Sequence, residues 1–208
     1  MLSQDEFARS ILPFTLKEEG GFSDDPHDPG NWTGGKVGAG VMKGTMHGIA
    51  ASSHPALDIA HLGVAQCAAI YWAEYMPAWL RDLSRQRALV VFDCAVNCGV
   101  GVAKKLLSRM DLAASDPQFI AAFSAANLAY HQRLKTWPRY GHVWAARILR
   151  AKAQAVQLAT GRERSPAAPP AASTPARSVP QAKTQSPVGF WAGIGRSISE
   201  VFRTDPYA

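Results

Sequence analysis

The sequence has no uninterrupted apolar run that approaches the roughly 20 residues of a membrane-spanning helix. It has only three cysteines, an odd number that argues against a disulfide framework. Cys94 and Cys98 lie one helical turn apart with no histidine near them in sequence, so we expect buried free thiols rather than a zinc site. The opening "MLSQDEF" has two acids and no basic residue, unlike a secretion signal, and we expect synthesis in the cytoplasm.

Motifs of several enzyme classes are also missing. The chain has no H-E-x-x-H sequence, no cluster of cysteine and histidine, and no nucleophile elbow of the serine hydrolases. We therefore expect no metal and no other cofactor. What is present is positive charge: 22 Lys and Arg face 16 Asp and Glu, and the isoelectric point is about 9.4. Such a charge suits nucleic acid, anionic lipid or an acidic cell wall, so charge alone does not choose the partner.

Periodicity and composition divide the chain. Ser3 and Glu6 form a capping box that starts a helix, which Pro13 should kink and the glycines at 20 and 21 should end. Residues 22–48 are rich in Gly, Pro and Asp and predict a small β-hairpin lobe. The remaining expected elements are helices over 63–75, 86–110 (interrupted near 99–101), 116–135 and 139–160, a proline-rich linker over 162–187, and an amphipathic helix over 188–204.

The stretch "KEEGGFSDDPHDPGNWTGG" gathers five carboxylates within eleven residues of a basic chain. Glu19 is expected at a helix C-terminus, where the negative end of the helix dipole and the neighbouring Glu18 favour the protonated form needed by a general acid. Asp28 lies in a stiff polar turn, where an acid stays ionised. Two such carboxylates across a cleft are the arrangement of a glycosidase. The alternatives are a solvated loop and, for Asp28, a cap of its own turn.

Several segments resemble glycoside hydrolase family 108, the N-acetylmuramidases of phage endolysins and secretion-associated muramidases. They are "EEGGFSDDPHDPGNWTGG", "KGTMHGIA", "VVFDCAVNCGVGVAKKLL" and "RYGHVWAARI". The resemblance implies a mainly α, lysozyme-like α+β fold with a small β lobe. It makes Glu19 the catalytic acid. The spacing from Glu19 to Asp28, followed by a threonine, also resembles that of phage-type lysozymes, in which the Asp and the Thr flank the attacking water. About a dozen extra residues precede "GTMHGI", so Thr33 and Thr45 both remain candidates for the threonine role.

The resemblance also implies a function and its partners. The chain is expected to cleave the β-1,4 bond between N-acetylmuramic acid and N-acetylglucosamine in peptidoglycan, as a monomer and without nucleic acid. Residues 1–83 would form the catalytic part and residues 84–161 a peptidoglycan-binding part. In a phage setting the enzyme waits in the host cytoplasm until a holin releases it. A lytic transglycosylase on the same fold and a wall-binding protein without turnover are the alternatives.

Five further residues are candidates for substrate contact. Each also has an ordinary structural explanation. The aromatic residues Trp137, Tyr140 and Trp144 are spaced as on one helix and can belong to the core. Asn97 can form a buried polar pair with Asp93 that bonds the backbone. The C-terminal helix is expected to contact a membrane or another protein. The five candidates are Asn97, Trp137, Tyr140, Trp144 and Arg147.

Overall fold

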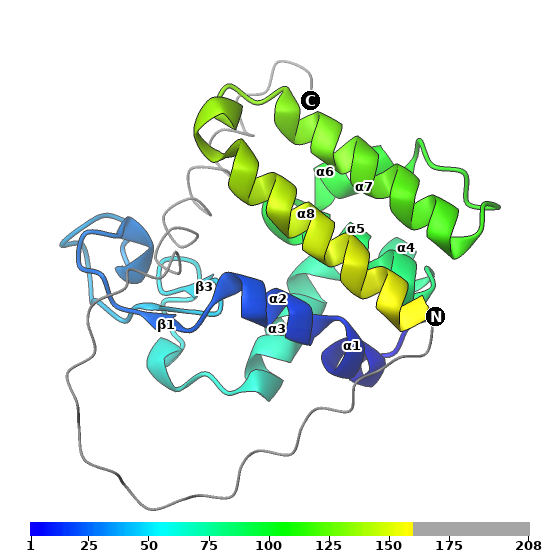
Figure 1. Ribbon diagram of the computed structural model, residues 1–208. Coiled ribbons are helices and arrows are strands. Elements are labelled where there is room, and N and C mark those ends of the chain that lie inside the picture. The colour runs from blue at the N-terminus through cyan, green and yellow to red at the C-terminus, as the bar shows by residue number, and fades with distance from the viewer. Residues whose placement is uncertain (160–208) are drawn as a thin grey trace, which may run out of the picture.

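The computed structural model describes residues 1–159, which form eight α-helices and one three-stranded antiparallel sheet. The strands lie at one side of the helices (Figure 1). This confirms the expected mainly α architecture with a small β lobe. The expected linker over 162–187 and the helix over 188–204 lie outside the described residues. Among the helices of residues 1–159, none is both long and apolar enough to cross a membrane.

Two short helices begin the chain, α1 (Gln4–Ser10) and α2 (Leu12–Glu19). The expected capping box is present: the Glu6 amide donates to Ser3 Oγ at 3.2 Å, and the Ser3 amide donates to Glu6 Oε2 at 3.1 Å. Pro13 lies in the first turn of α2, so the expected kink is a break between two helices. Gly20, with φ of 80°, ends α2. Glu19 is therefore the last residue of a helix, as the sequence predicts.

The β lobe consists of β1 (Phe22–Ser23), β2 (Thr45–Met46) and β3 (Ile49–Ala50), paired in that order. A two-residue turn joins β2 to β3, and both of its residues have positive φ, 48° and 76°, as in a type I′ turn. The long β1–β2 connection includes the short 3₁₀ helix η1 (Pro29–Asn31). Asn31 holds this connection in place through its side chain. Its Nδ2 donates to the Asp25 carbonyl at 2.9 Å, and its Oδ1 accepts from the Thr45 hydroxyl at 2.7 Å.

The rest of the described chain is helical. The expected segments match the observed helices to within a few residues, and Gly99 divides the 86–110 segment into two helices. The short helix α4 was not expected. The helices that follow the β lobe are η2 (Ile59–His61), α3 (Val64–Tyr75), α4 (Ala78–Arg81), α5 (Arg85–Cys98), α6 (Val100–Leu107), α7 (Asp116–Gln132) and α8 (Trp137–Ala159).

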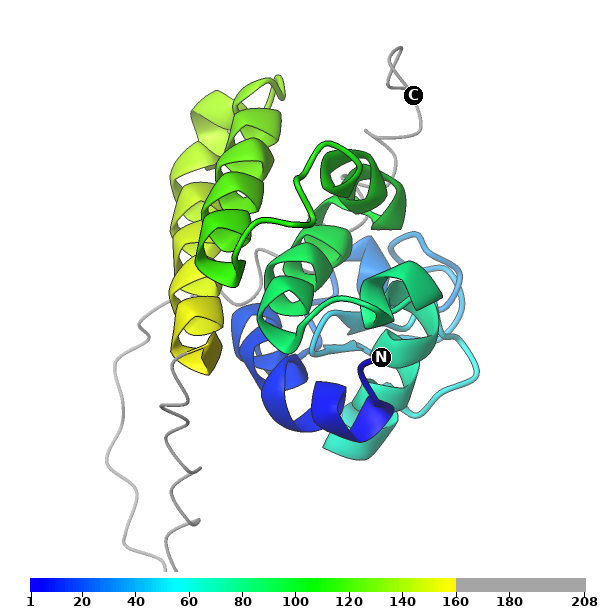
Figure 2. The ribbon, with the colours of Figure 1, turned by 90° about the vertical axis from the view of Figure 1, so that its right-hand side faces the viewer.

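Helix α5 is the centre of the core and packs against α3, α4, α6, α7 and α8. Figure 2 shows α7 and α8 side by side as a pair on one side of the other helices. Phe92 of α5 meets Phe7 of α1 edge-on, with 4.9 Å between ring centroids. One core therefore joins the N-terminal helices to the later ones. All three cysteines are buried free thiols, as predicted.

Candidate active site

Glu19 does not point into bulk solvent. Its side chain is 10% exposed, and its Oε1 accepts a hydrogen bond of 2.7 Å from Arg147 Nη1. This ion pair links the end of α2 to the middle of α8, across 128 positions of sequence. The charge of Arg147 opposes the effect of the helix dipole on Glu19, and local sequence did not predict this contact. Glu19 is thus paired with a basic side chain rather than isolated at the end of its helix.

Arg147 also binds Asp93 of α5. Its Nε donates to Asp93 Oδ1 at 2.9 Å, and both side chains are 2% exposed. Burial disfavours the charge of Arg147, but Asp93 and Glu19 outweigh that cost and raise its pKa. Burial raises the pKa of Asp93, while Arg147 acts in the opposite direction. The three side chains form one network, which we call the Glu19–Arg147–Asp93 network.

A second ion pair runs beside the first. Glu18 accepts two hydrogen bonds of 2.7 Å from the guanidinium of Arg150, one on each carboxylate oxygen. Arg150 is three residues after Arg147 on α8, so two adjacent acids of α2 meet two bases on one face of α8. The Arg147 side of this arrangement was missed, although paired acids and paired bases were visible in the sequence.

The second carboxylate oxygen of Glu19 faces the β2–β3 turn. A Cβ built on Gly48 would lie 3.0 Å from Glu19 Oε2 and 3.0 Å from the Tyr71 hydroxyl oxygen. The Tyr71 hydroxyl donates to the His47 carbonyl at 2.8 Å, which ties α3 to the same turn. Burial first, and then the charge of Glu19, raise the pKa of Tyr71 well above its ordinary value. Gly48 and Tyr71 therefore bound the space around the acid, and sequence reasoning gave neither of them this role.

The other predicted catalytic residues hold the loop of the β lobe. Asp28 is 8% exposed, and its Oδ1 accepts from the Gly30 amide at 2.8 Å, which caps η1 as the structural alternative predicted. Thr33 Oγ1 accepts from the Val41 amide at 2.9 Å. Thr45 is 3% exposed and bonds Asn31. The catalytic roles of Asp28, Thr33 and Thr45 stay predictions. These contacts do not show which of the two threonines would act beside Asp28.

Comparison with known proteins shows that the region of Glu19 is similar to a known family. The model of the glycosyl hydrolase 108 family matches residues 12–99. We call residues 12–99 the family 108 region. The match begins in α2 and ends just after α5, so it contains Glu19 and Asp93 while Arg147 lies beyond it. The expected resemblance to family 108 is thereby confirmed.

A solved structure has a similar fold. The structure of Brucella abortus SagA has a TM-score of 0.54 and 22% sequence identity to this chain, and the match covers 78% of this chain and 99% of SagA. At this identity the likeness shows the fold alone. No curated protein sequence matches the chain.

The aromatic candidates lie on α8, C-terminal to the family 108 region. Trp144 is buried against His131 and Tyr140, with ring centroids 5.1 and 5.8 Å away. Trp137 and Tyr140 are only half-buried. Inside the family 108 region, Asn97 donates to the Asp93 carbonyl at 2.7 Å, which is the backbone bond of the structural alternative. Trp144 and Arg147 thus lie beneath the surface, whereas Trp137 and Tyr140 reach it. Substrate contact by these five candidates stays a prediction.

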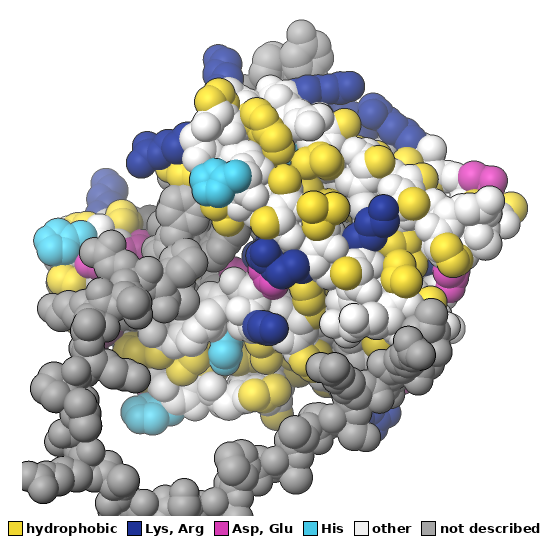
Figure 3. Space-filling model, in the orientation of Figure 1, with side chains coloured by type: hydrophobic (Ala, Val, Ile, Leu, Met, Phe, Trp, Pro, Cys, Tyr) yellow, Lys and Arg dark blue, Asp and Glu magenta, His cyan; other side chains and the backbone are white. Residues whose placement is uncertain are grey.

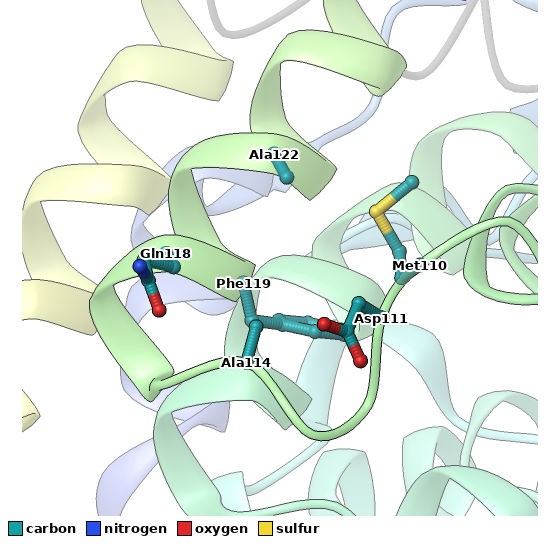
Figure 4. A pocket seen from close by; sticks show the side chains of 6 residues that line it. All are labelled: Met110, Asp111, Ala114, Gln118, Phe119 and Ala122. Carbon is teal, nitrogen blue, oxygen red and sulfur yellow. The ribbon is translucent and has the colours of Figure 1, made fainter.

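One surface hollow adjoins the segment that follows Glu19. It has a volume of about 430 Å³, within the range of small-ligand sites, and Phe22 of β1 is one of its walls. A second hollow, of about 300 Å³, lies where the α6–α7 connection meets α7 (Figure 4) and contains none of the predicted site residues. The first is lined by Phe22, Asp24, Met42, Lys43, Gly44, Ala56, Asp58 and Ala60. Among residues 1–159, no group of three or more His, Cys, Asp and Glu is placed to hold a metal ion.

Basic side chains gather near the α7–α8 connection. Figure 3 shows Lys and Arg side chains along the upper rim, around the place where Figure 1 shows α7 followed by α8. The exposed basic residues of this segment are Arg133, Lys135 and Arg139. They stand close in sequence to the half-buried Trp137 and Tyr140, so positive charge and aromatic surface occur together there.

Proposed function

We propose that the chain is an N-acetylmuramidase that hydrolyses the β-1,4 bond between N-acetylmuramic acid and N-acetylglucosamine in peptidoglycan. The observation that carries the proposal is the placement of Glu19 within the family 108 region. It ends α2, one oxygen is held by Arg147, and the other faces the β2–β3 turn. The Glu19 carboxyl group is bound by Arg147 of α8, a helix that is distant in sequence, and it is only 10% exposed. These contacts give it the fixed orientation that proton transfer to a glycosidic oxygen requires.

In this mechanism Glu19 protonates the oxygen of the leaving sugar, and a second polar group directs water to the anomeric carbon. We assign the second role to Asp28 with Thr33 or Thr45. The support is the rigidity of their loop, since Asp28 caps η1 and Asn31 joins the loop to Thr45. One oxygen of Asp28 is used by the cap.

We further assign the predicted partner and setting. Peptidoglycan is the substrate, with residues 1–83 as the catalytic part and residues 84–161 as the part that holds the wall. The half-buried Trp137 and Tyr140 supply faces on which sugar rings can stack. The net charge of +6 favours accumulation on an acidic wall. Release of the enzyme from a host cytoplasm during phage lysis is the biological role that fits these properties.

The test compares two adjacent glutamates. Glu19→Gln is expected to abolish clearing of peptidoglycan in a zymogram, because the amide is too weak an acid to transfer a proton to the leaving oxygen. Removal of a general acid lowers the rate by about 10²–10⁴-fold. Glu18→Gln is the matched control: it removes a carboxylate from the same helix turn and leaves the Glu19–Arg147 bond in place. Equal clearing by wild type and Glu19→Gln would contradict the proposal.

A further inference from the structure

Asn31 is a fully buried amide that contacts both the proposed base and one of the two candidate threonines. Its backbone amide donates to the Asp28 carbonyl at 3.1 Å. Its side-chain Oδ1 accepts from the Thr45 hydroxyl at 2.7 Å. Asn31 also belongs to η1, the 3₁₀ helix that the Asp28 side chain caps. The position of Asn31 therefore sets how Asp28 and Thr45 stand relative to each other.

The second hydrogen bond of the Asn31 side chain fixes the direction of the first. Its Nδ2 lies 2.9 Å from the Asp25 carbonyl oxygen. A carbonyl oxygen can only accept a hydrogen bond, so the amide nitrogen has to face Asp25 and the amide oxygen has to face Thr45. That amide oxygen can also only accept. The Thr45 hydroxyl therefore donates its one hydrogen to Asn31, and its oxygen keeps lone pairs that can accept a hydrogen bond.

We propose that Asn31 is a positioning residue for hydrolysis, which holds the Thr45 hydroxyl as an acceptor for the attacking water. Water that donates its two hydrogens to Asp28 Oδ2 and Thr45 Oγ1 presents a lone pair to the anomeric carbon. A hydroxyl without this restraint could donate to the water instead and occupy the lone pair that attacks. The inference rests on the proposed function, in which Asp28 and a threonine direct water, and it selects Thr45.

The step itself balances without any further reactant. The water oxygen forms a bond to the anomeric carbon while the bond from that carbon to the leaving oxygen breaks. One proton of the water passes to Asp28, and the leaving oxygen takes the proton of Glu19. Thr45 accepts a hydrogen bond throughout and exchanges no proton. Asn31 touches neither water nor sugar and acts through Thr45.

The place of Thr45 in the β lobe brings it near Glu19. Thr45 begins β2, and the turn after β2 contains Gly48, where an added Cβ would lie 3.0 Å from Glu19 Oε2. Three residues of extended chain span at most about 10 Å, so the backbones of Thr45 and Gly48 lie within about that distance. Thr45 is only 3% exposed, which suits contact with a water molecule rather than with a sugar ring.

Thr33 is held by different contacts. Its Oγ1 accepts from the Val41 amide at 2.9 Å, and its own amide donates to the Val41 carbonyl at 3.0 Å. Gly40 packs against the same hydroxyl, because a Cβ added to this glycine would overlap Thr33 Oγ1. These contacts close the glycine-rich part of the β1–β2 connection on itself. The Thr33 hydroxyl therefore serves the loop, whereas the Thr45 hydroxyl is oriented by Asn31.

The test is a double-mutant cycle on kcat and KM for hydrolysis of soluble peptidoglycan strands by the full chain. Thr45→Val removes the hydroxyl at nearly constant volume and should lower kcat about tenfold, the effect of one lost hydrogen bond. KM should change little, because the lost contact is to water. Thr45→Ser keeps a hydroxyl and should restore most of kcat.

Asn31→Ala completes the cycle, since the backbone bond to Asp28 survives in this variant. It should lower kcat by a factor similar to that of Thr45→Val. Added to Thr45→Val, it should lower kcat little further, because the hydroxyl that Asn31 orients is already absent. A purely structural role would instead multiply the two losses. This lack of additivity in kcat is the signature of positioning.

Two further variants guard against loss of folding and against the wrong threonine. Thermal unfolding of each variant identifies any that does not fold. If Asn31→Ala does not fold, Asn31→Asp takes its place, because it has nearly the same shape and keeps an oxygen toward Thr45. It should lose less kcat than Thr45→Val. Thr33→Val breaks the bond to the Val41 amide, so it should lower the unfolding midpoint while losing less kcat than Thr45→Val.

The outcomes distinguish the inference from the proposed function. Multiplied losses of kcat in the double variant overturn the inference, and so does a larger loss in Asn31→Asp than in Thr45→Val. Wild-type kcat in Thr45→Val, or an equal loss in Thr33→Val, also overturns it. The proposed function fails on a separate result, wild-type activity of Glu19→Gln. If Glu19→Gln is inactive while Thr45→Val and Asn31→Ala keep the wild-type kcat, only the role of Asn31 and Thr45 is lost.

Discussion

At the scale of single residues, Gly48 controls how closely the β lobe approaches Glu19. Its φ is 76°, and an added Cβ would lie 3.0 Å from Glu19 Oε2. We expect Gly48→Ala to displace the carboxylate and to reduce peptidoglycan hydrolysis strongly, in addition to a backbone cost of about 1–2 kcal/mol in the free energy of unfolding. Initial rates and urea unfolding measure the two effects.

Gly38 is the matched control for that change. Its φ is 77°, but an added Cβ meets nothing within 4 Å. Gly38→Ala should show the backbone cost while the hydrolysis rate stays near that of the wild type. If both variants lose activity equally, contact between Gly48 and Glu19 is not what matters.

Asp93 should also leave a signature in stability. Its pKa in the folded chain is raised above the ordinary value of 3.8, so the folded state binds its proton more tightly than the unfolded state. The contribution of Asp93 to the free energy of unfolding therefore falls as pH rises from that ordinary value through the raised one. Asp93→Asn lacks this fall. In urea unfolding from about pH 3.5 upward, the stability advantage of the wild type should shrink with rising pH, and a constant difference would refute the assignment.

At the scale of elements, α2 and α8 are joined by two ion pairs of unequal burial. Arg147 is 2% exposed and Arg150 is 52% exposed. Arg147→Gln removes the cation that binds the buried Asp93 and the 10% exposed Glu19, and it should lower the free energy of unfolding by about 3–5 kcal/mol. Arg150→Gln breaks a solvent-screened pair and should cost about 0–1 kcal/mol. Equal losses in urea unfolding would show that burial does not set the difference.

The elements also show which features the sequence could predict. Caps and stops act over a few residues, so the capping box at Ser3 and the end of α2 at Gly20 were predicted correctly. Sequence motifs placed Glu19 at that end. The partner of Glu19 could not be chosen in this way, because the chain has 22 Lys and Arg and the observed one is 128 positions away.

Local sequence patterns could not predict which side chains of α8 are buried either. Trp144 and Arg147 share a helix face, and periodicity alone does not say whether that face meets sugar or protein. Their burial follows from α5 and α7, which pack against α8. The connection between β1 and β2 is held by the hydrogen bond between Asn31 and Thr45, and hydrophobic periodicity does not predict such a bond. The short helix α4 was missed for a similar reason, because four residues give too little pattern.

At the scale of the whole molecule, the described chain has one core rather than two. Helix α5 belongs to the proposed peptidoglycan-binding part, yet Phe92 packs on Phe7 and Tyr71 of the proposed catalytic part. Residues 1–159 should therefore unfold as one cooperative unit. In urea, tryptophan fluorescence and far-ultraviolet circular dichroism should give coincident transitions. Two separate transitions would mean that the two parts are independent domains.

The central claim is that this molecule hydrolyses a sugar bond in peptidoglycan with Glu19 as the acid. The most direct measurement is mass spectrometry of peptidoglycan fragments produced in ¹⁸O-labelled water. The account predicts fragments with reducing N-acetylmuramic acid ends that contain one ¹⁸O atom, and their loss with Glu19→Gln but not with Glu18→Gln. Unlabelled 1,6-anhydro ends would reveal a transglycosylase instead, and labelled fragments of equal yield from Glu19→Gln would contradict the role of Glu19.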